Sequence, residues 1–194
     1  MNTNLKLLRG ALCVAAVAVV LAGFAAAQVE TIDATARGTS TQMGNIGSIK
    51  VIINQFSTPE DRTVLKDAFQ KGGNEALVKA LSKMKSAGRI QVPGTVGYDL
   101  AYAIAIPTPT GRKIRFVTNR RIAFREAYRD TQSQAYDLTA GEIEINDQDK
   151  GKSAGVLYPA AQLGIDSDGQ VSISLRKNPW QLTNIIDWKG KGKD

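Results

Sequence analysis

An unbroken apolar run from Ala11 to Ala27 follows a short basic leader at the start of the chain. If this segment is removed, it determines which residues are left to form the fold. Lys6 and Arg9 precede the run without an acidic residue, and three alanines end it directly before Gln28. A basic start, an apolar stretch and small residues at a cleavage point are typical of a secretory signal peptide. We therefore expect residues 1–27 to be removed on export across the inner membrane, which leaves a periplasmic or extracellular protein.

Two other interpretations of this segment are less favoured. An uncleaved membrane anchor would have to cross a hydrocarbon core about 30 Å thick, for which an alanine-rich run of this length is short. Lipidation at Cys13 would require the apolar stretch before the cysteine, whereas in this chain it follows. We thus expect no lipid anchor and no stable membrane span after cleavage.

The residue counts then limit both the fold and the chemistry. Cys13 is the single cysteine of the chain and there is no histidine, so the exported part has neither a thiol nor an imidazole. It must fold without the disulfides common in secreted domains, which a domain of this size can do on its hydrophobic core alone. The lack of histidine excludes Ser-His-Asp and Cys-His nucleophiles and His-ligated zinc or haem. We expect no metal and no cofactor.

The clearest local signal is a helix start at Thr58–Asp61, where a capping hydroxyl precedes a first-turn proline and two acids. Apolar residues at helical spacing follow, and Gly72–Gly73 end the helix. Asn74 is placed to cap a second helix that ends near Gly88. Because the connection is so short, the two segments predict a helical hairpin.

Most of the remaining chain has the two-residue alternation of β-strands. Ile49–Phe56 is almost continuously apolar, and Tyr98–Ile106 alternates large apolar residues with alanines. We expect the large residues in the main core and the helical hairpin over the alanine side. Gln28–Thr41 holds a weak strand at an edge or a loosely attached arm, and 122–128 is ambiguous between strand and helical turn. The other expected strands are Lys113–Thr118, Tyr136–Ile145, Gly155–Ile165, Val171–Leu175 and Leu182–Trp188.

Short strands at hairpin spacing and one helical hairpin together predict an α+β fold dominated by antiparallel β-structure. A sandwich and a partly closed barrel both fit this pattern. We expect one domain over residues 28–188, followed by a flexible basic tail at 189–194.

A series of segments, in this order, resembles a family of small secreted bacterial proteins known only as hypothetical proteins. The likeness runs from about Ile49 to Ile185 and implies a signal peptide and a shared fold, but no function and no site residues. The family has Trp where Phe56 stands and Asp where Asn119 stands, so an acid–base role at the second position does not extend to this chain. The segments are Phe56–Thr58, Asp61–Arg62, Gly72–Gly73, Pro93–Gly94, Gly97–Leu100, Thr118–Arg120, Ile122–Ala127, Tyr136–Glu142 and Pro179–Asn184.

Two groups of residues are candidates for binding. The densest basic stretch, Arg112 to Arg129, contains Arg115, Arg120, Arg121 and Arg125, and guanidinium groups bind phosphate and carboxylate well. Because the protein is exported, we expect no nucleic-acid partner and take anionic lipid or polysaccharide as the partner. The alternative for this stretch is an ordinary solvated basic face.

The second candidate group consists of aromatic residues, chiefly Tyr98 and Tyr102. A curved sheet or barrel beneath a helical lid can enclose a small apolar ligand, and these rings could line such a cavity. The alternative is that the aromatic side chains simply fill the core.

Acidic residues give weaker signals. Asp166–Gly169 looks like a calcium loop, but its ligand spacing fails, so we expect a hairpin turn there. Glu142 and Glu144 are two residues apart on one predicted strand and therefore share one face, opposite Ile143 and Ile145. We interpret that face as solvated, although paired carboxylates are also what a glycosidase requires.

The sequence thus favours a non-catalytic binding protein of the cell envelope or extracellular space, whose ligand is an apolar small molecule or an anionic surface. A carboxylate-dependent hydrolase acting on polysaccharide is the alternative. A structural component of an envelope assembly, joined through exposed strand edges, is another. Ligand identity and oligomeric state stay open.

Overall fold

The computed structural model describes residues 29–40, 43–92, 95–120, 122, 138–177 and 179–189. Most of the elements are strands, and helices are few. In chain order, the elements are β1 (Glu30–Gly38), β2 (Ile46–Ile53), α1 (Pro59–Leu81), β3 (Gly88–Gln91), β4 (Tyr98–Thr108), β5 (Gly111–Thr118), β6 (Leu138–Asn146), the 3-10 helix η2 (Lys150–Lys152), β7 (Ala154–Ile165), β8 (Val171–Lys177) and β9 (Trp180–Asp187).

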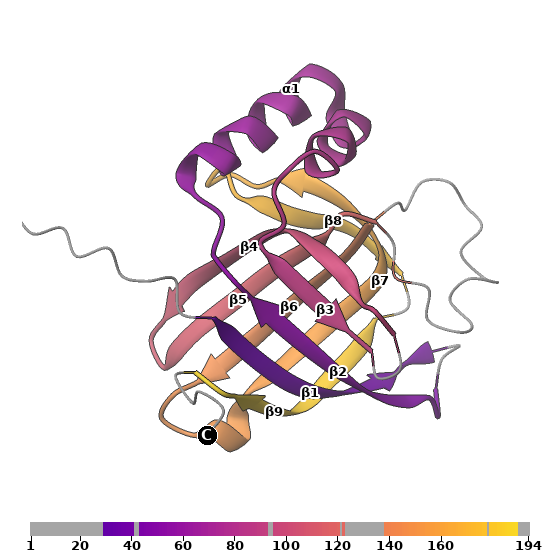
Figure 1. Cartoon of the computed structure of the whole chain (residues 1–194), viewed down its shortest axis with the longest axis vertical. Coiled ribbons are helices and arrows are strands. Elements are labelled where there is room, and N and C mark those ends of the chain that lie inside the picture. Colours follow the sequence, from indigo (N-terminus) through magenta and orange to yellow (C-terminus); the bar gives the residue numbers. More distant parts are fainter. Residues whose placement is uncertain are drawn as a thin grey trace, which may run out of the picture.

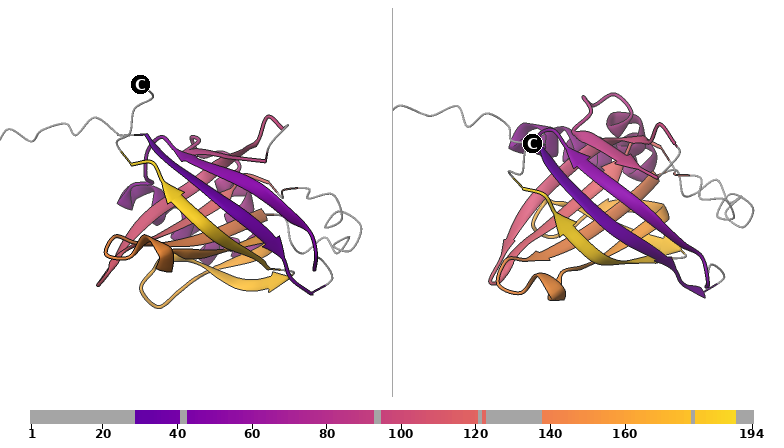
Figure 2. Two further views of the ribbon diagram at one scale, coloured as in Figure 1. Left: turned by 90° about the horizontal axis from the view of Figure 1, so that it is seen from below. Right: turned by 60° about the horizontal axis from the view of Figure 1, so that its bottom comes forward.

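Eight of these strands form a closed antiparallel barrel (Figures 1 and 2). The strand order is β6-β5-β4-β3-β2-β1-β9-β7, and the pairing of β6 with β7 closes the ring. The remaining strand, β8, pairs with the C-terminal half of β7 outside the ring. The prediction of a mainly antiparallel α+β fold is therefore confirmed, and of its two alternatives the structure is the barrel.

Side chains fill the barrel interior. Every second residue of β1, namely Ile32, Ala34 and Ala36, faces inward and is buried with apolar residues of the other seven barrel strands. Phe116 of β5 packs across Gly141 of β6, where an added Cβ would lie only 2.3 Å from the ring. This contact requires glycine, and it shows how closely the interior is packed.

The structure changes two expectations about individual strands. Residues Glu30–Gly38 form a full strand between β2 and β9, as Figure 2 shows, rather than an edge strand or a loose arm. Gly88, expected to end a helix, instead begins β3, where a side chain would collide with the backbone oxygen of Ile52 at 2.0 Å. Strand β3 has only four residues, too few to show the two-residue alternation that identifies a strand in the sequence.

Helix α1 begins as expected. The Thr58 hydroxyl accepts the N–H of Asp61, and the Asp61 carboxylate accepts the N–H of Thr58, which together form a capping box. Gly72 and Gly73 leave the helical conformation, the latter with φ 59°, so the element bends sharply into two arms (Figure 1). The Asn74 side chain, expected to cap the second arm, instead accepts the backbone N–H of Leu163 in β7 at 3.0 Å.

The apolar face of α1 packs on the outside of the barrel. Leu65, Leu77 and Leu81 are fully buried in a second core that includes Tyr102 of β4 and residues of β5 to β8. The expectation that the alanine side of β4 lies under the helix holds for Ala101 and is wrong from Tyr102 onward. A register shift between Leu100 and Tyr102 reverses the alternation, so that Leu100 faces the interior and Tyr102 faces α1.

Both ends of the chain lie outside the described residues. Residues 1–28 and 190–194 lie outside the described part, and so does the expected signal peptide. Among the described helices, none combines the length and the apolar character needed to cross a membrane. Of the ambiguous segment 122–128, only Ile122 is described, and it is buried with the interior core.

Candidate ligand-binding groove

Two neighbouring pockets lie on the outside of the barrel, between the start of α1, the outer face of β4 and the turn that joins β7 to β8. The first has a volume of about 230 Å³ and the second about 310 Å³, and both are lined by Ile106 and Gln170. We call the pair the outer groove. The first pocket is lined mainly by Pro59, Arg62, Tyr102, Ile104, Ile106 and Gln170. The second is lined mainly by Ile106, Lys113, Arg115, Asp166, Asp168 and Gln170.

The local fold explains why a groove forms at this place. Strand β3 pairs with β4 only as far as Leu100, so the rest of that β4 edge is available to other segments. Ser57 takes the next position, since its N–H donates to the Ala103 oxygen at 2.7 Å and its hydroxyl accepts the Ala103 N–H at 3.0 Å. These bonds fix the start of α1 beside the outer face of β4.

The β7–β8 turn forms the other wall. One carboxylate oxygen of Asp166 accepts the backbone N–H groups of Asp168 at 3.1 Å and Gln170 at 2.8 Å, which confirms the predicted hairpin turn. A Cβ added at Gly169 would lie 3.9 Å from the ammonium nitrogen of Lys66 on α1. The turn therefore lies close against the helix and bounds the groove.

Tyr102 is the most unusual residue of the outer groove. Its side chain is fully buried, and its hydroxyl has no hydrogen-bond partner among the described residues. Burial raises the pKa of Tyr102, while the charges of Arg62 and Arg115 oppose this shift and those of Asp61 and Asp166 add to it. The hydroxyl thus stays protonated near neutral pH and lies among charged groups from both pockets.

The six predicted binding residues divide into three groups. Tyr102 and Arg115 line the outer groove, although Arg115 is held by Glu142 at 2.6 Å and by the Val171 oxygen at 2.7 Å. Tyr98 packs against the interior core, and Arg120 lies over its ring at 5.3 Å. Neither of these two lines a groove pocket. Arg121 and Arg125 lie outside the described residues.

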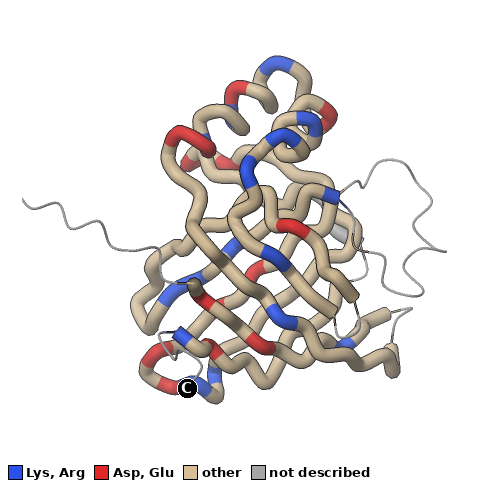
Figure 3. The backbone as a smooth tube through the Cα atoms, in the orientation of Figure 1, with Lys and Arg blue, Asp and Glu red and all other residues tan. Residues whose placement is uncertain are grey.

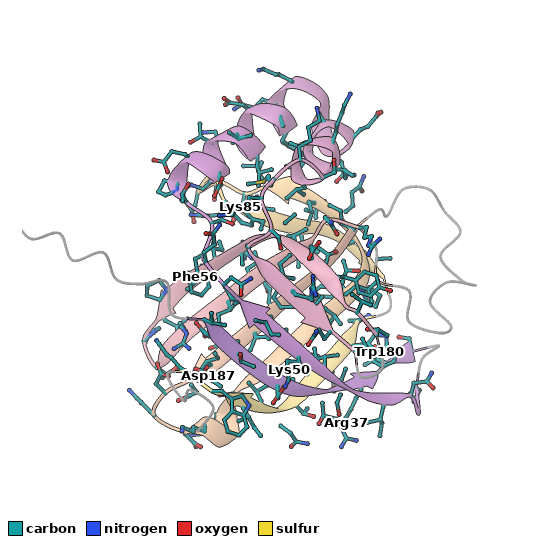
Figure 4. All side chains as sticks on the ribbon, in the orientation of Figure 1. Arg37, Lys50, Phe56, Lys85, Trp180 and Asp187 are labelled. Atoms are coloured by element: carbon teal, nitrogen blue, oxygen red, sulfur yellow. The ribbon has the colours of Figure 1, made fainter. Side chains whose placement is uncertain are left out.

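Arg112, in the same basic stretch, lies at one end of the barrel and not on a basic face. Its guanidinium donates to Glu30 at 2.6 Å and to Asp187 at 2.5 Å, and lies 3.7 Å from Asp147. Burial alone would lower the pKa of Arg112, but the hydrogen bond and charge of Glu30, followed by those of Asp187, raise it. Figure 4 labels Asp187 at the end of β9 opposite Trp180. This ion cluster joins β1, β5 and β9.

Other charges are spread over the molecule. In Figure 3, basic and acidic residues are interspersed along α1 and over the barrel. Glu142 and Glu144 lie on the outer face of β6, opposite buried Ile143 and Ile145, as predicted. Within the described ranges, no three potential ligand side chains gather in a way that could hold a metal ion.

Sequence reasoning misses three residues of the outer groove. Arg62 follows the helix cap and has no sequence feature that links it to a strand far along the chain. Alternation assigns Ile106 to the core, but the β4 register shift reverses that alternation. Gln170 lies beside a predicted turn, but only the folded chain brings that turn to α1.

Comparison of the chain with protein-family models, with curated proteins and with solved structures finds no match. The resemblance to small secreted bacterial proteins therefore stays a prediction. Any function must be inferred from the outer groove itself.

Proposed function

We propose that this chain is an exported, non-catalytic binding protein that holds a small, partly apolar molecule in the outer groove. The observation that supports this most is the Tyr102 hydroxyl, which is buried at a pocket wall without a partner among the described residues. A buried polar group without a hydrogen bond costs about 1–3 kcal/mol. A ligand that supplies the missing bond would recover that free energy.

The location differs from the concave inner face of the sheet. Large apolar side chains such as Phe116, Leu157 and Trp180 occupy the interior, each with at most 5% of its surface exposed. A ligand there would have to displace close-packed side chains, which is costly. The outer groove already has open pockets, so a ligand there needs to move only the groups that cover the Tyr102 hydroxyl.

The alternative ligand, an anionic surface, has less support from the described arginines. Arg112 and Arg115 are each hydrogen-bonded to acidic side chains, and Arg120 lies over a tyrosine ring. A guanidinium that is already paired has fewer donors to offer a phosphate or sulfate.

The hydrolase and assembly hypotheses also have less support. The two buried carboxylates that converge, Glu30 and Asp187, both accept from one nitrogen of Arg112. Catalysis on a polysaccharide would require carboxyl groups that face a substrate. An assembly could use the outer edge of β8, but no described feature indicates a partner for it.

Native mass spectrometry of the exported protein, purified from its own host, tests the proposal. We expect bound mass on the wild type. We expect that mass to be lost in Ile106→Trp, because the larger side chain fills the space that both pockets share at this position. Ile186→Trp is the matched control, because Ile186 is 48% exposed on β9 and lies outside the groove. Wild-type protein without bound mass, or bound mass that survives in Ile106→Trp, would contradict the proposal.

A further inference from the structure

Hydrogen-bond donors dominate the polar lining of the first pocket. The Ser57 hydroxyl oxygen already accepts the N–H of Ala103 at 3.0 Å, and the Thr58 hydroxyl oxygen accepts that of Asp61 at 3.2 Å. A hydroxyl that accepts in this way still has its own hydrogen to donate. The Thr58 hydroxyl donates its hydrogen to the Glu60 carboxylate, so the lining keeps two O–H groups for a ligand, those of Ser57 and Tyr102.

The same pocket has one charged side chain in its lining, that of Arg62. Among the described residues, no carboxylate forms an ion pair with Arg62. The acidic side chains nearest to this pocket are either hydrogen-bonded to the backbone or line the second pocket. Asp61 accepts the Thr58 N–H, and Asp166 and Asp168 line the second pocket instead. The first pocket thus combines one positive charge with several donors.

Apolar side chains form the rest of the wall, chiefly Ile104, Ile106 and Pro107. The volume of about 230 Å³ equals that of about eight water molecules, at roughly 30 Å³ each. This limits the part of a ligand inside the pocket to a small group with a short hydrocarbon chain. A ligand that extends further would reach the second pocket past Ile106 and Gln170.

Resting on the function proposed above, we propose that the first pocket binds the carboxylate of a small aliphatic carboxylic acid. The carboxylate accepts from the Tyr102 hydroxyl and the Arg62 guanidinium, and the chain lies along Ile104 and Ile106. One arginine balances one negative charge, which fits a monocarboxylate better than a doubly charged phosphate. The second pocket has two cations and two acids in its lining, so its charges balance, whereas the single charge of the first pocket is positive.

Octanoate and its neutral isostere octanamide test the assignment by titration into the full exported protein, followed by NMR of the backbone amides. We expect octanoate to bind with a dissociation constant in the millimolar range, as is typical of a ligand of about ten non-hydrogen atoms. Octanamide should bind about tenfold more weakly, because it lacks the charge-assisted hydrogen bonds. Amides of β4 around Ile104 should shift with octanoate.

Two variants with matched controls identify the contacts. Arg62→Gln should weaken octanoate about tenfold and leave octanamide nearly unchanged. Tyr102→Phe should weaken both ligands, octanoate more strongly, because the amide oxygen also accepts from the hydroxyl. Tyr98→Phe and Arg89→Gln, at a ring and a cation outside the groove, should change neither. Because Tyr102→Phe removes a hydroxyl without a described partner, we expect it to fold normally.

The outcomes separate this inference from the function it rests on. Equal binding of octanoate and octanamide, or no effect of Arg62→Gln, would overturn the carboxylate assignment and leave an apolar groove in place. Absence of octanoate binding would also overturn it. Failure of the broader function is detected independently, by the bound mass of wild-type and Ile106→Trp protein.

Discussion

Among single residues, Arg112 makes the densest set of ionic contacts in the described part of the chain. Its guanidinium lies between Glu30 at the start of β1 and Asp187 at the end of β9, and all three side chains are at most 14% exposed. Such a cluster stabilises a fold only as long as every charge keeps its partner. The pKa of Arg112 is raised in the fold, so its contribution is complete below the ordinary arginine value and would be lost only in strong alkali.

We expect Arg112→Met to lower the free energy of unfolding by about 3 kcal/mol, because it leaves two buried carboxylates without their cation. Adding Glu30→Gln and Asp187→Asn to this variant should restore part of the loss. Urea denaturation monitored by tryptophan fluorescence measures both changes. Lys50→Met, which removes a cation 3.7 Å from Asp33 on the exposed face, is the control and should cost less than about 1 kcal/mol. Equal losses in the two single variants would contradict a structural role for the buried cluster.

Among the elements, α1 and β4 show which features a sequence reveals. The start of α1 is encoded within four residues, and the capping box predicted from Thr58–Asp61 is present. The face of β4 is not encoded locally, since one irregularity between Leu100 and Tyr102 reverses which side chains face α1. The sequence therefore selects Tyr102 as an aromatic residue but assigns it to the inner face of the sheet, whereas it lies on the outer face.

The helix cap gives a prediction with a pH dependence. We expect Thr58→Ala to lower the free energy of unfolding by about 1 kcal/mol near neutral pH, through loss of the capping hydroxyl. Hydrogen bonds from the Glu60 backbone and from Thr58 lower the pKa of Glu60, so its stabilisation is present above the ordinary carboxyl range and declines as pH falls through the lowered value. The variant should lose less stability than the wild type between pH 6 and pH 3.

Denaturant titrations at the two pH values measure this difference. Thr63→Ala is the control, since its hydroxyl donates to the Pro59 oxygen in the same part of α1 without capping it. We expect this control to change stability by no more than about 0.5 kcal/mol. A Thr58→Ala variant that behaves like Thr63→Ala would show that the cap contributes nothing.

In the whole molecule, closure of the sheet is what positions the groove. Alternation predicts most strands and the α+β class, because each strand carries its own pattern. Closure depends on the pairing of distant segments, above all β1 with β9, which no local pattern specifies. The same holds for the outer groove, where Arg62, Tyr102 and Gln170 meet only after the β7–β8 turn reaches α1.

A ligand of this protein should lie outside the filled barrel and not within it. NMR of protein labelled at the isoleucine methyl groups, with octanoate present, tests this most directly through intermolecular nuclear Overhauser effects. We expect contacts from the alkyl chain to Ile104 and Ile106, on the outer face of β4. Contacts to Ile114 and Ile143, which are fully buried in the interior, would contradict the account.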